Sequence, residues 1–181
     1  MKRTQNRNFH EEQSPAGLRL FAAIRFTEPF RDAVLDCQHC LKQGAASGNF
    51  TRPENLHMTL AFIGEVKDPA PALRAVKSVS FAPFSLALTE GGTFGGSLYW
   101  LGAESGNRAE ELASSIRSAL KREGVPFDTK PFRSHITLGR EVVLSAPVRM
   151  KVPAASMTVS HISLMKSERI NGKLVYTEIH G

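Results

Sequence analysis

The chain has few cysteines and no apolar segment long enough to cross a membrane. Its two cysteines, Cys37 and Cys40, have the spacing of half a zinc site or of a redox pair, but no second pair exists to complete a metal site. Redox pairs usually begin a helix, whereas this pair falls near the end of a predicted one. We therefore interpret both as small apolar side chains on a helix, and predict no structural metal.

Sequence patterns for ATP and Mg²⁺ binding are also missing. The chain contains no Gly-x4-Gly-Lys loop for ATP and no cluster of Asp and Glu suited to Mg²⁺, so no cofactor is predicted. The first ten residues are polar and basic, without the apolar stretch of a secretory signal, which favours a cytoplasmic protein. We expect a flexible basic tail over residues 1–17, a single domain over 18–181, and a monomer.

Basic residues outnumber acidic ones, giving a net charge of +6 and a pI near 9.6. Such an excess favours a polyanionic partner through salt-dependent attraction. Charge alone is weak evidence, because many housekeeping proteins are basic. The net charge supports a polyanionic partner only if the chain also has a site of the right size and chemistry for phosphate.

A tetrapeptide containing one histidine and one threonine occurs twice: residues 57–60 read HMTL and residues 135–138 read HITL. Chance would place only about 0.3 His-x-Thr pairs in a chain with six His and ten Thr, and fewer with apolar residues at both other positions. Both copies lie in stretches that alternate like β-strands. His and Thr two residues apart then share one face, while the apolar pair points into the core.

Two such strands facing each other would place two imidazoles and two hydroxyls around one small anion. His57 and His135 could serve as acid and base near neutral pH, and Thr59 and Thr137 could donate hydrogen bonds to phosphate oxygens. This set of groups suits phosphodiester chemistry without a metal. Residues 161–164 (HISL) share the pattern with Ser in place of Thr, and the pattern alone does not dismiss them.

The residues around the two tetrapeptides carry a family resemblance. Residues 53–66 (PENLHMTLAFIGEV) and 131–140 (PFRSHITLGR) resemble the two signatures of the RNA 2′,3′-cyclic phosphodiesterases, also called 2′-5′ RNA ligases, of the 2H phosphoesterase superfamily. Residues 18–24 are similar to the family's opening strand, and residues 164–167 with Tyr176 are similar to its closing one. The family carries no catalytic histidine in that closing strand, so His161 is expected to be an exposed strand residue.

The resemblance implies an α+β fold: two pseudo-symmetric lobes of antiparallel sheet with outer helices and an active-site cleft between them. It also implies hydrolysis of RNA 2′,3′-cyclic phosphate ends, with His57 as proton donor to the leaving 3′-oxygen and His135 as proton acceptor from water. A 2′-phosphate remains, and the reverse reaction would form a 2′-5′ linkage. The alternatives are a relative acting on 2′-5′ oligoadenylate or a cyclic ADP-ribose phosphate, and a non-catalytic basic RNA-binding module.

Three further residues are candidates for substrate binding. Arg140 matches an arginine of the family motif and could hold the phosphate with two hydrogen bonds, or could be a solvated residue at the end of a strand. Phe21 could stack on a base or belong to the core. Arg133 shares the strand face of His135 and could meet the RNA backbone.

The remaining pattern predicts alternating strands and helices. Expected strands are 18–26, 56–64, 84–89, 97–101, 132–140, 157–165 and 173–179, with a link or edge strand at 48–52. Expected helices are 69–79, 107–123 and one that begins after Thr27 and ends near Gln43, before Gly44. An irregular surface loop is expected over 142–153.

Overall fold

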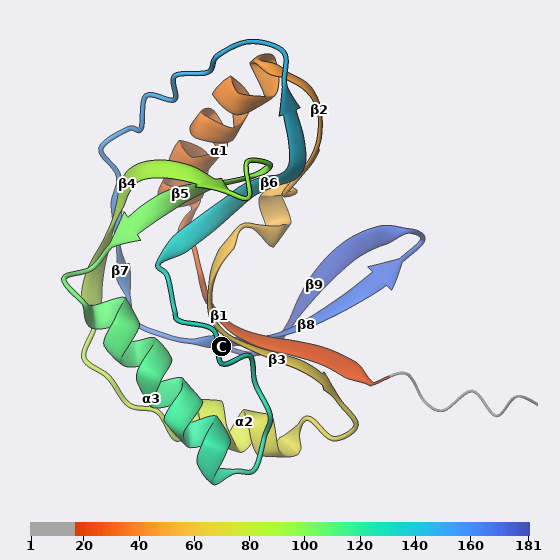
Figure 1. The fold of residues 1–181 in the computed structure, drawn as a ribbon. Helices are drawn as coiled ribbons and strands as arrows, with labels where there is room; N and C mark the ends of the chain where they lie inside the picture. The colour runs from red at the N-terminus through yellow and green to blue at the C-terminus, as the bar shows by residue number, and fades with distance from the viewer. Residues whose placement is uncertain (1–16) are drawn as a thin grey trace, which may run out of the picture.

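The computed structural model describes residues 17–181. Except for Gly17, the predicted tail lies outside them. The fold is α+β with two antiparallel sheets (Figure 1), as predicted. One sheet has the strand order β3 (His57–Val66), β1 (Leu18–Arg25), β8 (Ser163–Ile170) and β9 (Lys173–His180). The other has the order β2 (Ala45–Phe50), β6 (His135–Leu144), β5 (Leu98–Glu104), β4 (Phe84–Phe94) and β7 (Ser156–Val159).

The helices are α1 (Glu28–Gln43), α2 (Ala70–Lys77) and α3 (Arg108–Arg122), with a short 3₁₀ turn η1 (Pro53–Asn55) ahead of β3. The bounds of α1 follow from local signals: Pro29 stands in its first turn and Gly44 ends it. Thr27 takes the N-cap position, but its carbonyl, rather than its side chain, bonds the helix by accepting from Arg31 N at 2.9 Å. No helix within the described residues is both long and apolar enough to span a membrane.

Each helix that precedes a tetrapeptide strand packs against the sheet holding the other tetrapeptide. Helix α1, ahead of β3, contacts β2 and β6, whereas α3, ahead of β6, contacts β3 and α2. Figure 1 accordingly shows α1 beside β2 and β6, with α2 and α3 together at the other end of the molecule. Buried side chains from both sheets and all three helices form one continuous core.

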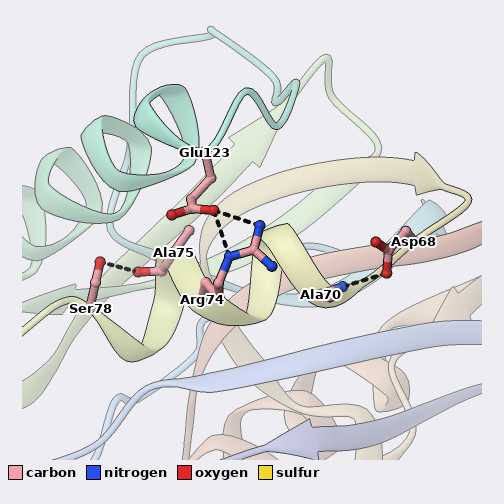
Figure 2. A network of polar contacts seen from close by, with 6 residues as sticks. All are labelled: Asp68, Ala70, Arg74, Ala75, Ser78 and Glu123. Atoms are coloured by element: carbon pink, nitrogen blue, oxygen red, sulfur yellow. Dashed lines mark hydrogen bonds and ion pairs between the residues drawn. The ribbon is translucent and has the colours of Figure 1, made fainter.

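Figure 2 shows the polar contacts around α2, one of which joins it to the end of α3. Arg74 of α2 makes an ion pair with Glu123, just beyond α3, with Nη2 and Oε2 2.9 Å apart. The backbone N–H of Ala70 donates to Asp68 at 2.9 Å where α2 begins, and the hydroxyl of Ser78 donates to the Ala75 carbonyl at 2.8 Å where it ends. The ion pair joins the two helices, and the other two contacts close the ends of α2.

Three expectations about strands were wrong. The segment 157–165 is two strands, β7 and β8, in different sheets, because its alternation breaks at the exposed residues Ser160 and His161. His161 is therefore exposed, as expected, but lies in a connection rather than a strand. Strand β4 continues past Gly91 and Gly92 to Phe94. Strand β6 begins at His135 and reaches Leu144, so the loop expected from residue 142 starts later.

Candidate active site

The first tetrapeptide begins β3, at the edge of the four-stranded sheet, where it pairs with β1 alone. Met58 and Leu60 are buried in the core, whereas His57 and Thr59 are half-buried on the opposite face. The predicted alternation is thus present in the structure. Because the apolar neighbours hold the backbone, the imidazole and the hydroxyl have a fixed direction.

The second tetrapeptide begins β6, which lies between β2 and β5 of the other sheet. Ile136 and Leu138 are fully buried, and His135 and Thr137 are half-buried on the other face. The two sheets meet at these strands: Ser134 Oγ lies 3.1 Å from Met58 Sδ and also donates to the Ala103 carbonyl. The structure therefore brings the tetrapeptides together from segments far apart in the sequence.

Both histidines make the same bond to their own chain. Nδ1 of His57 lies 2.7 Å from the carbonyl oxygen of Asn55, and Nδ1 of His135 lies 2.8 Å from that of Arg133. A carbonyl oxygen only accepts hydrogen bonds, so Nδ1 carries the hydrogen in each ring. Nε2 is left as the nitrogen that can exchange a proton with a substrate.

Thr59 is coupled to His57 through the remaining ring nitrogen, with Oγ1 2.9 Å from Nε2. While His57 is neutral, Nε2 is an acceptor and the Thr59 hydroxyl donates to it. Once His57 is protonated, Nε2–H donates instead and the Thr59 hydrogen is free for another acceptor. Protonation of His57 therefore turns Thr59 into a donor toward the site.

Burial lowers the pKa of His57 to about 4, from an ordinary value of 6.5. The hydrogen bond to Asn55 acts in the opposite direction, and the nearby charges of His135 and Arg140 lower the pKa further. The free protein thus holds a neutral His57 at neutral pH. An anion bound beside Arg140 would offset its charge and raise this pKa.

This low pKa predicts a pH-dependent stability. Between about pH 4 and 6.5 the unfolded chain binds a proton at His57 that the folded protein does not bind, so stability rises with pH across this window and is lost as pH falls. The free energy of unfolding of the wild type and of His57→Asn should be measured with urea from pH 4 to 7. The difference between the two free energies should change by on the order of 2 kcal/mol across this range, allowing for the solvent that reaches the ring. His39→Asn, on the exposed face of α1, is the control. Parallel pH curves for the wild type and His57→Asn would contradict this assignment.

Aromatic rings enclose His57. The Phe21 ring lies 4.9 Å from it and the Tyr176 ring 5.3 Å, centre to centre. Only 3% of Phe21 is exposed, so its ring packs against His57 in the interior, which corresponds to the core position named as one of its two alternatives. Tyr176 is half-buried; burial raises its pKa, against the charges of Arg140 and Arg19. Its phenol therefore keeps its hydrogen at neutral pH.

A second aromatic group lies beside His135. Phe94 stacks on Trp100 with ring centres 5.0 Å apart, and Phe94 lies 5.4 Å from the His135 ring. Arg133 is exposed and its guanidinium lies 5.7 Å from the centre of the Phe94 ring. Gly92 gives the Trp100 ring room, since a Cβ there would approach the ring to 3.0 Å and the ring would have to shift.

Arg140 is exposed on β6 and lies close enough for its charge to act on both His57 and Tyr176. The next residue, Glu141, has a φ of +53°, and the pairing of β2 with β6 shifts register here. Such a bulge redirects a strand near its end. Asn49 of β2 holds the bulge by donating to Glu141 at 2.5 Å.

Behind β6, a buried glutamine ties the second tetrapeptide to α1. The side-chain amide of Gln38 donates to the carbonyls of Thr51 and Leu138, at 2.7 and 2.8 Å. The Thr51 hydroxyl donates to the carbonyl of Thr137 at 2.9 Å. These bonds hold the strand of His135 and Thr137 from its far side.

Reasoning from the sequence found the two His/Thr pairs but missed the residues that surround them. Asn55 supplies a carbonyl to His57 and a side-chain bond to Leu174 at 2.9 Å, which joins η1 to β9. Phe94, beside a glycine pair, was not singled out, and Tyr176 entered only through the resemblance. Asn55 is local to the site, on η1 two residues ahead of His57. Phe94 and Tyr176 reach the site through strand pairing, which carries no local signal.

Cys37 and Cys40 lie on α1 as free thiols, in agreement with the helical interpretation. Burial raises the pKa of Cys37 to about 11, so it stays protonated at neutral pH. Among residues 17–181, no three His, Cys, Asp or Glu side chains gather as a metal site.

Comparison with known proteins agrees with this geometry. Residues 24–171 match the model of the 2′-5′ RNA ligase superfamily. The RNA 2′,3′-cyclic phosphodiesterase of Methanothermobacter thermautotrophicus is 31% identical over 183 aligned positions, covering 90% of this chain and 96% of that protein. The protein of the same name from Escherichia coli is 32% identical, covering 89% and 93%.

Solved structures show the same fold. The crystal structure of E. coli LigT complexed with 3′-AMP superposes with a TM-score of 0.77 at 29% identity, covering 91% of this chain and 96% of that one. TT0787 of Thermus thermophilus also gives a TM-score of 0.77, at 26% identity, covering 90% and 95%. The resemblance predicted from the sequence is thus confirmed: the chain belongs to the 2′-5′ RNA ligase superfamily and groups with the RNA 2′,3′-cyclic phosphodiesterases, which are hydrolases.

Proposed function

We propose that this protein hydrolyses RNA 2′,3′-cyclic phosphate ends to 2′-phosphomonoesters by metal-free acid–base catalysis. One observation carries the proposal: His57 and His135 lie on neighbouring strands of two sheets, and each is fixed by an Nδ1–H bond to a carbonyl two residues back. Two rings held in this way present two Nε2 atoms for proton transfer. The relatives named above are the second support.

In the proposed reaction, His135 Nε2 takes a proton from water as the water oxygen bonds to phosphorus. The P–O3′ bond breaks on the opposite side, and His57 donates a proton to the departing 3′-oxygen. The product carries a 3′-hydroxyl and a 2′-phosphate. A 5′-hydroxyl in place of water would attack phosphorus in the same way, with the same P–O3′ bond breaking, and would give a 2′-5′ linkage, although water, at far higher concentration, favours hydrolysis.

The electrostatics of the site give this scheme an order of events. Free His57 is neutral at neutral pH, chiefly because of burial, with the charge of Arg140 acting in the same direction. We infer that the anionic cyclic phosphate raises this pKa, so that His57 takes up its proton together with the substrate. The same step releases the Thr59 hydroxyl to donate to a phosphate oxygen. We assign Thr137 and Arg140 to donate hydrogen bonds to the remaining oxygens of the phosphate.

The proposal predicts activity in EDTA. An RNA with a 2′,3′-cyclic phosphate end, incubated with EDTA-treated protein, should be converted to the 2′-phosphate, identified by chromatography against 2′- and 3′-phosphate standards. Conversion only after metal is added would overturn the metal-free mechanism.

A parallel panel with 2′-5′ oligoadenylate and a cyclic ADP-ribose phosphate tests the substrate, since hydrolysis of those compounds alone would reject the RNA assignment.

A further inference from the structure

A hollow of about 230 Å³ lies outside the candidate active site, and is lined by residues of α3 and of the segment 123–134 that leads from it to β6. Its lining combines three kinds of group. Two side chains are cationic, two carry hydroxyls and two are aromatic, and one further side chain is a carboxylate: Arg117, Lys121, Ser114, Ser118, Phe127, Phe132 and Glu110. Cations and hydroxyls bind phosphate, and aromatic rings stack on bases. The lining thus matches the chemistry of one nucleotide.

Arg117 has a donor without an acceptor. Its Nε is buried and has no hydrogen-bond partner among residues 17–181, and none of the ion pairs in this part of the chain includes Arg117. Because no ion pair among these residues holds the Arg117 guanidinium, its positive charge is available to an anion in the hollow.

The hollow and the candidate active site are joined by consecutive residues. Phe132 lines the hollow, while the guanidinium of Arg133 lies 5.7 Å from the Phe94 ring beside His135. Only two residues lie between Phe132 and His135, so their Cα atoms lie at most roughly 11 Å apart. A short stretch of single-stranded RNA can span this distance past Arg133.

We propose that this hollow binds a nucleotide of the RNA strand on the 5′ side of the cyclic phosphate end. This inference rests on the proposed function. Because the cyclic phosphate closes the 3′ end, the rest of the RNA leaves the site as one strand in one direction. Arg117 and Lys121 bind its phosphate, and Phe132 stacks on its base. The protein should then prefer RNA oligonucleotides to cyclic mononucleotides.

The test compares kcat/KM for a 2′,3′-cyclic mononucleotide and for a short RNA oligonucleotide with the same cyclic end. The wild type should favour the oligonucleotide. Arg117→Gln and Phe132→Leu should each lower kcat/KM for the oligonucleotide by about tenfold and leave the value for the mononucleotide unchanged. Arg108→Gln is the matched control, because it removes the same charge from α3 at a residue paired with Glu111 and outside the hollow.

Equal loss on both substrates, or no loss on the oligonucleotide, would overturn the subsite. Fluorescence anisotropy of a labelled RNA with a 2′-phosphate end gives a reading that does not depend on turnover. If the wild type hydrolyses neither substrate, the proposed function fails, but the affinity still decides the subsite: weaker binding by Arg117→Gln than by Arg108→Gln supports it, and equal binding rejects it.

Discussion

His135→Ala and His57→Ala should each lower kcat for hydrolysis of an RNA 2′,3′-cyclic phosphate by about 10²–10⁴-fold, the range that a positioned acid or base supplies. Each substitution removes the only Nε2 on its side of the phosphate, because Thr59 and Thr137 have no proton that titrates near neutral pH. Single-turnover kinetics and RNA affinity should be measured separately. Affinity should change far less than turnover, because Arg140 and the hydroxyls remain.

The control for this experiment is His161→Ala. Residues 161–164 share the tetrapeptide pattern, but His161 is exposed in the β7–β8 connection, so its removal should leave turnover unchanged. Parallel loss of turnover, affinity and melting temperature in His57→Ala and His135→Ala would instead favour a basic RNA-binding protein with structural histidines.

The second prediction separates the acid from the base. A nitrophenyl ester of a nucleotide 2′- or 3′-phosphate has a leaving group that departs without a proton. His57→Ala, having lost the acid, should recover most of its deficit on this substrate, up to about 10²-fold relative to RNA. His135→Ala has lost the base and should stay impaired on both substrates. The ratio of kcat/KM for the two substrates in each variant is the measurement.

Recovery by His135→Ala instead would reverse the roles. His57, already neutral in the free protein because burial lowers its pKa to about 4, would then be the base. If His57 is the acid, it must take up its proton when the anionic phosphate binds, because it is neutral in the free protein. Recovery by His57→Ala would therefore also support that uptake. Phosphate-free controls at matched ionic strength keep a competing anion out of the site.

The sequence predicted those parts of the molecule whose signals are local. Helix α1 occupies the predicted range because Pro29 and Gly44 act within one turn of its ends. The faces of β3 and β6 follow from alternation, with Met58 and Ile136 buried opposite the histidines. Two-residue periodicity decides both, and no distant contact is needed.

The rest of the fold depends on pairing that the sequence does not display. Strands β7 and β8 join different sheets although they are separated by only three residues, and no local propensity distinguishes their partners. Phe21 illustrates the same limit within the site. Its position on β1 was predicted, but its burial against Tyr176 depends on β9, which lies more than a hundred residues away. Whether an aromatic ring faces RNA or core is decided by such contacts.

The path of the chain through the two sheets has a consequence for synthesis on the ribosome. Strand β1 lies between β3 and β8, so one of its edges stays unpaired until the last strands of the chain have emerged. An open edge beside apolar residues is prone to pairing with other chains. The last two strands therefore protect the nascent protein from aggregation as well as bringing Tyr176 to His57.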